Sequence, residues 1–135
     1  MAKLNHKGAT LLEISICMSL FLIGMQSLLT VTTQCMVYSK RAEYVYTAYN
    51  LAKNHMERLK AVNFSSLATA AETSTTINTD GDPDENGRFI RSTTVTSNYT
   101  GDANLVQITV SVYYVMKNVQ SSKPMQISCV IYNGG

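Results

Sequence analysis

One carboxylate, Glu13, stands inside an apolar run that extends from Leu11 to Val31. A charged carboxylate within a bilayer segment costs about 2.5–3.5 kcal/mol on insertion scales, so such a residue is expected to have a partner and a function. The alternative is that Glu13 lies near the membrane edge and extends its carboxylate to the headgroups. The choice between these two interpretations depends on the residues that precede it.

A second candidate site is the acidic segment 80–87, which reads Asp-Gly-Asp-Pro-Asp-Glu-Asn-Gly. Its oxygen-bearing side chains match the first half of a D-x-D-x-N-G calcium loop, in which a bidentate acid is expected at the twelfth position. Thr93 occupies that position, so the match is incomplete. A calcium site and a solvated turn are therefore both open. The candidate calcium ligands are Asp80, Asp82, Asp84 and Asn86.

The cysteines and histidines show no catalytic pattern. Cys17, Cys35 and Cys129 cannot all pair within one chain, and they form no C-x-x-C motif. Cys35 and Cys129 both fall where a helix and a sheet are expected to meet, so either a disulfide or two buried thiols can result. His55 has no Ser, Cys or second His at a useful spacing, so no nucleophile or metal set forms and an enzyme is not expected.

The N-terminus as a whole predicts a membrane anchor. Residues 1–8 are short and basic, and the run of about 20 apolar residues that follows is long enough to cross a hydrocarbon core. Lysines precede this run and none follows it until Lys40, which predicts a cytoplasmic N-terminus and an exported remainder. A secretory signal peptide is the rival interpretation, but the end of the run lacks a small-x-small cleavage pattern. With a net charge of +2, the chain gives no indication of a nucleic-acid partner.

The residues around Gly8 resemble the processing motif of type IV pilins and type II secretion pseudopilins. In that family a short basic leader ends in Gly, and a small or aromatic residue, Thr, two aliphatic residues and Glu follow. In this sequence the motif reads Lys7-Gly8-Ala9-Thr10-Leu11-Leu12-Glu13, with Ala9 where many members have Phe.

The resemblance implies that a prepilin peptidase cuts between Gly8 and Ala9 and then N-methylates Ala9. It also implies that Glu13 neutralises the new amine, within the subunit or on a neighbour. A buried carboxylate beside a buried ammonium avoids two uncompensated charges. Because the amine exists only after cleavage, processing and assembly become linked.

The same resemblance implies partners and a location. The partners are a prepilin peptidase, other pilin or pseudopilin subunits, an inner-membrane assembly platform and, before assembly, the lipid bilayer. The chain would lie in the bacterial inner membrane with a periplasmic head, and afterwards in a pilus or pseudopilus. Segments 51–61 and 86–95 are more loosely similar to V-type minor pilins and I-type minor pseudopilins, which favours a minor subunit over a major pilin.

The elements that must position these residues follow from periodicity. No proline occurs before Pro83, and Gly24 is the only glycine between residues 9 and 80, which predicts one helix over about 9–62. Alternation predicts strands at 89–96, 105–115 and 125–132. An antiparallel meander of this size needs a cover on one face, which the second half of the helix provides. The helix carries an apolar stripe of Val31, Cys35, Tyr38, Ala42, Val45, Tyr49, Ala52, Met56 and Leu59.

These expectations combine into an α+β, pilin-like fold. Its parts are a leader over 1–8, a transmembrane or filament-core helix over 9–32 and an exported head over 33–135. Within the head we predict helix 33–62, loop 63–87 and a three-stranded sheet over 88–132. Two functions remain open: a minor pilin or minor pseudopilin of a pilus-like or type II secretion filament, or a membrane-tethered, non-polymerising module that binds calcium or another ligand. The second function would need neither Gly8 nor Glu13.

Overall fold

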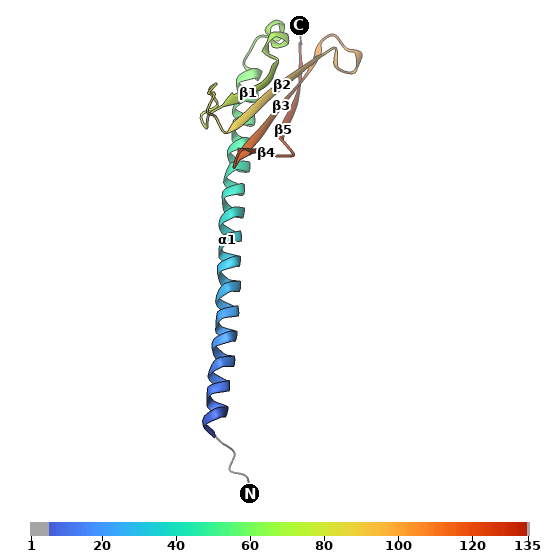
Figure 1. Cartoon of the computed structure of the whole chain (residues 1–135). Helices are drawn as coiled ribbons and strands as arrows, with labels where there is room; N and C mark the ends of the chain where they lie inside the picture. Colours follow the sequence, from blue (N-terminus) through green and yellow to red (C-terminus); the bar gives the residue numbers. More distant parts are fainter. Residues whose placement is uncertain (1–5, 135) are drawn as a thin grey trace. The chain divides into compact units, whose positions relative to one another are not determined.

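The computed structural model describes residues 6–134, with side chains from Thr10 onward (Figure 1). The predicted α+β class is confirmed, because a long N-terminal helix is followed by an antiparallel sheet. The elements in chain order are helix α1 (His6–Lys60), 3-10 helix η1 (Phe64–Ala70), strands β1 (Glu72–Ile77) and β2 (Phe89–Ser97), 3-10 helix η2 (Tyr99–Gly101), and strands β3 (Leu105–Met116), β4 (Val119–Gln120) and β5 (Met125–Tyr132).

The chain divides into two units, residues 1–40 and residues 41–135, and α1 belongs to both. In the first unit every residue from Thr10 to Lys40 is exposed. This part of the helix is long and apolar enough to cross a membrane by length and composition. Six of its hydroxyl groups are satisfied locally, because each donates to the backbone carbonyl four residues earlier. These six are Ser15, Ser19, Ser27, Thr30, Thr32 and Thr33.

In the second unit, the sheet has the predicted antiparallel meander at its centre. Strand β3 pairs with β2 on one side and with β5 on the other, and β1 adds to the far side of β2. Side chains of β3 alternate between buried and half-buried positions, as its sequence pattern predicts. The buried ones are Val106, Ile108, Val110, Val112 and Tyr114.

The C-terminal half of α1 covers this buried face. Ala48, Leu51, Ala52, Met56 and Leu59 are buried and form one core with the inward-facing residues of the sheet. These helix positions recur at steps of three and four, so they line one face. The core continues onto β5 through Met125, Ile127, Cys129 and Ile131, which are half-buried.

Part of the predicted apolar stripe is wrong. Tyr38 and Tyr49 were expected to face the core, but their side chains are 65% and 48% exposed. The predicted stripe repeats every 3.5 residues, whereas a straight helix turns every 3.6, so the two faces drift apart along the chain. Residues of α1 join the core only from Tyr44 onward.

The prediction of a loop over 63–87 is also wrong. The segment contains η1 and β1, and Leu67 and Ile77 from it are almost completely buried. Strand β1 forms because its Ser- and Thr-rich sequence can pair with β2, which supplies the backbone partners. The two-residue strand β4 lies between the predicted strands 105–115 and 125–132, so the sheet has five strands rather than three.

Candidate functional site

The predicted cleavage point lies at the start of α1. The backbone of Gly8 and Ala9 is helical, whereas residues 1–5 of the predicted leader lie outside the described residues. Cleavage, methylation and the role of Glu13 therefore stay predictions. Glu13 itself is exposed on the helix, in a shallow groove with Thr10, Ile14, Cys17, Met18 and Phe21.

Glu13 differs from the other polar groups near it. The six hydroxyls of the apolar segment bond to their own helix, so they can enter a lipid or protein interior without an unsatisfied group. A carboxylate cannot do this, since the carbonyls of its own helix offer it no donor. Within the described part of the chain, Glu13 forms no ion pair. It is also the only Asp, Glu, Lys or Arg between Thr10 and Ser39.

The carboxylates of the acidic segment 80–87 do not gather into a cluster in the described structure. Among the described residues, no three or more His, Cys, Asp or Glu side chains come together as a metal site would require. The segment is instead a hydrogen-bonded turn. The Asn78 side chain accepts from the backbone N–H groups of Asp80 and Asp82, and Asp84 Oδ1 accepts from the N–H of Asn86, at 2.9–3.0 Å. One oxygen of Asp84 therefore serves the backbone of the turn, and calcium binding by this segment stays a prediction.

Of the two alternatives for Cys35 and Cys129, a disulfide and a pair of buried thiols, the structure does not contain the disulfide. All three cysteines are free thiols, with Cys17 and Cys35 exposed and Cys129 half-buried. The prediction placed both partners in the helix–sheet interface, but the residues of α1 that join the core begin only at Tyr44. Cys35 therefore precedes the covered part of the helix.

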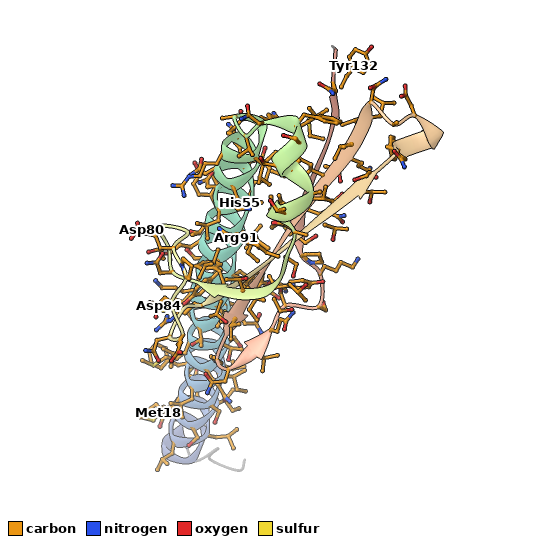
Figure 2. The ribbon with its side chains drawn as sticks, turned by 90° about the horizontal axis from the view of Figure 1, so that it is seen from above. Met18, His55, Asp80, Asp84, Arg91 and Tyr132 are labelled. Carbon is orange, nitrogen blue, oxygen red and sulfur yellow. The ribbon has the colours of Figure 1, made fainter. Side chains whose placement is uncertain are left out.

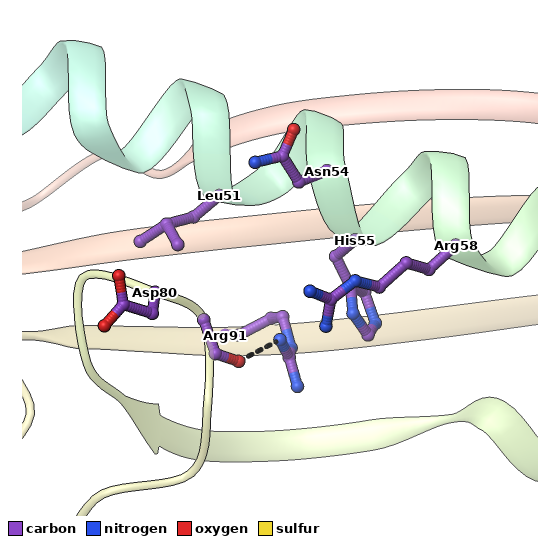
Figure 3. A pocket seen from close by; sticks show the side chains of 7 residues that line it. Leu51, Asn54, His55, Arg58, Asp80 and Arg91 are labelled. Carbon is purple, nitrogen blue, oxygen red and sulfur yellow. Dashed lines mark hydrogen bonds between the residues drawn. The ribbon is translucent and has the colours of Figure 1, made fainter.

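A polar network that the sequence did not suggest lies inside the head. Arg91 on β2 is buried and holds the Glu72 carboxylate with two nitrogens, at 2.8 and 3.2 Å. Its Nη1 also donates to the carbonyl of Gly81 at 3.0 Å (Figure 3). Beside it, His55 Nε2 lies 3.2 Å from the Thr93 hydroxyl, so α1, β1, β2 and the acidic turn share one set of contacts.

Three of these residues, His55, Gly81 and Arg91, line a small pocket. The other lining residues are Leu51, Asn54, Arg58 and Asp80. Figure 2 shows His55 and Arg91 in the interior of the head and Asp80 and Asp84 along one edge of it. The network has the character of a structural joint, because the guanidinium of Arg91 is already occupied by a carboxylate and a carbonyl. No local sequence motif predicts this network, since the hydrogen-bonded residues are 10 to 38 positions apart in the sequence.

The head is expected to lose stability as the pH falls below about 6.5. Burial lowers the pKa of His55, and the nearby Arg91 and Arg58 lower it further against an opposing effect of Glu72. The ring therefore takes up a proton less readily in the folded head than in the unfolded chain. The stabilising effect is complete above the pKa of the unfolded chain and is lost as pH falls from there toward the lower pKa of the folded state.

Thermal melts followed by tyrosine near-ultraviolet circular dichroism at pH 7.5 and 5.5 measure this effect on the full chain in detergent. The unfolding midpoint should be lower at pH 5.5, and His55→Gln should reduce the difference because an amide does not titrate in this range. An equal pH dependence in the variant would show that another group is responsible.

The fold and the site define a pilin-like architecture: an N-terminal apolar helix, long enough to span a membrane, whose second half packs on an antiparallel sheet. Comparisons with protein-family models, with curated proteins and with solved structures give no match.

Proposed function

We propose that the chain is a structural subunit, a minor pilin or minor pseudopilin, of a type IV pilus-like or type II secretion filament. In this proposal a prepilin peptidase removes residues 1–8 and methylates Ala9. The subunit waits in the bacterial inner membrane with its head in the periplasm, and the assembly platform then transfers it into the filament. Its role is packing between subunits rather than catalysis.

The observation that carries the proposal is the N-terminal half of α1. Large apolar side chains are exposed all along this half of the helix. Contact of so many apolar side chains with water is unfavourable. Lipid would cover them before assembly and other N-terminal helices afterwards. The lone carboxylate at the fifth position after the predicted cut supplies a charge that a neighbouring ammonium can neutralise.

The alternative is a membrane-tethered module that never polymerises. It shares the anchor and the head, but it assigns no purpose to the Gly8–Ala9 bond or to Glu13. Its calcium-binding form gains no support from the described residues, in which no three acidic side chains converge.

Cleavage after Gly8 is the first expectation to test. Intact mass and N-terminal sequencing of the full chain, expressed with and without a prepilin peptidase, should give a methylated Ala9 terminus only when the peptidase is present. Gly8→Arg should abolish the product, because a long charged side chain at the cut cannot occupy a site shaped for glycine.

Lys7→Arg serves as the matched control, since it places the same side chain one residue earlier and keeps the charge of the leader. This variant should be processed normally. A terminus that remains at Met1 in the presence of the peptidase, or a cut beyond Val31, would reject the proposal in favour of the tethered module or a secreted domain.

A further inference from the structure

Two connections of the head lie at the same end of the sheet and on its opposite edges. Ile77 at the end of β1 pairs with Phe89, Phe89 pairs with Tyr114 near the end of β3, and β5 begins opposite Val112. The β1–β2 connection and the segment that joins β3 to β5 are therefore at one level. Figure 1 shows the β1–β2 connection on one side of the head and β4 on the other.

The β1–β2 connection is strongly negative. We call residues 80–85 the acidic lobe, in which all four carboxylate residues are exposed. The lobe also occupies the free edge of β1, because Asp84 donates its N–H to the carbonyl of Thr76 at 3.0 Å and Pro83 forms a bridge with Ile77. A further strand cannot easily pair there, so the lobe meets a partner through its side chains. The four residues are Asp80, Asp82, Asp84 and Glu85.

The opposite edge is positive. We call residues 117–123 the basic lobe; Lys117 and Lys123 are exposed, and between them Val119 is 68% exposed. Lys117 and Asn118 both have positive φ angles, 52° and 61°, as in the tight turns that fix the tip of a hairpin. No Asp or Glu occurs after Asp102, so no carboxylate side chain from β3 or β5 neutralises this edge.

The two lobes of one chain are too far apart to pair with each other. They are separated by the width of β1, β2, β3 and β5, which at about 4.8 Å per strand is on the order of 14 Å. In copies that share one orientation, however, a sideways displacement along the sheet brings the acidic lobe of one head against the basic lobe of the next. Such a contact is heterologous, because each of the two copies contributes a different edge to it.

We propose that heads of this chain dock edge to edge, with the acidic lobe of one copy against the basic lobe of a second copy. This inference rests on the proposed function for the shared orientation, which a common membrane or filament would impose. Charge complementarity sets the register of the two heads, and Val119 provides an apolar contact between the lysines.

Zero-length cross-linking tests the contact, because a carbodiimide joins only carboxylates and lysine amines that touch. The processed full chain is reconstituted in vesicles, treated, digested and mapped by mass spectrometry. We expect amides between the two lobes in products of dimer mass. The ion pair between Lys60 and Glu57, with Nζ 2.9 Å from Oε1, gives an internal control, since its amide forms within one chain.

Charge reversal makes the test specific. Asp80→Lys with Asp82→Lys, or Lys117→Glu with Lys123→Glu, should each lower the dimer product by about fivefold or more, since two exposed pairs become repulsive. Mixing the two variants should restore it in trans. Asp84 is left unchanged because its carboxylate accepts the Asn86 N–H.

The possible outcomes distinguish a failure of the docking proposal from a failure of the proposed filament role. A processed chain that enters filaments, gives the Lys60–Glu57 amide and shows no lobe-to-lobe amide overturns the docking and leaves the proposed function. Lobe amides to a different protein alone also overturn it. A chain that is never cleaved but still forms lobe-to-lobe amides supports the docking and removes the filament role.

Discussion

Glu13→Ala should leave cleavage after Gly8 intact and reduce entry of the processed subunit into filaments by more than about a hundredfold. Cleavage creates an ammonium group at Ala9, four residues before the carboxylate. Inside a packed bundle of helices that ammonium needs a partner, and removing one member of a buried ion pair costs about 3–5 kcal/mol. The variant remains well suited to lipid, because alanine removes the only charged side chain of the apolar segment.

The measurement is the amount of processed subunit in sheared filaments relative to the amount in membranes. Gln26→Ala is the matched control, since it removes another long polar side chain from the same exposed, apolar stretch of helix. It should assemble normally. Glu13→Gln should behave like alanine if the charge matters, and like the wild type if only hydrogen bonding matters. Normal incorporation of Glu13→Ala would remove the role proposed for this residue.

The regular parts of the fold were predictable because their sequence periods are strong. The helix was predicted over about 9–62 and extends over His6–Lys60, and β5 has the predicted bounds, Met125–Tyr132. Strand β3 alternates from Leu105 to Val115, so its buried face could be predicted directly. Strand β1 was missed because Ser74 interrupts it with a φ of 51° and its register shifts between Glu72 and Thr75. Its one apolar residue after the shift, Ile77, was too weak a signal.

The candidate sites also differ in how far the sequence predicts them. Glu13 was visible because a carboxylate in an apolar run departs from the local composition. The acidic turn was visible too, but its composition does not reveal whether carboxylates converge on an ion or bond to the backbone. The joint of Arg91, Glu72 and His55 could not be predicted, since it depends on how β1, β2 and α1 meet in space. Sequence spacing contains no such information for residues this far apart.

Gly87→Ala should lower the free energy of unfolding of the head by about 1–3 kcal/mol. A Cβ at this position would overlap the backbone carbonyl of Ile77 and lie 2.9 Å from the carbonyl oxygen of Asp84. Both obstacles are backbone atoms, so no change of side-chain rotamer relieves them. The turn must move instead, which weakens the hydrogen bond from the Gly87 N–H to the Asp84 carbonyl, 3.0 Å long.

The substitution should also destabilise the neighbouring part of the core, because Gly87 lies just before the start of β2. Arg88 Nη1 donates to the Tyr44 hydroxyl at 2.7 Å, and the Tyr44 and Phe89 rings pack with centroids 6.0 Å apart, so a shift of the turn disturbs the edge of the core. Each kcal/mol lost from the free energy of unfolding lowers the melting temperature of a domain of this size by roughly 4–8 °C. Gly24→Ala, the same chemical change in open space on α1, should not lower it. Equal melting temperatures for Gly87→Ala and the wild type would mean that the turn has another conformation in solution.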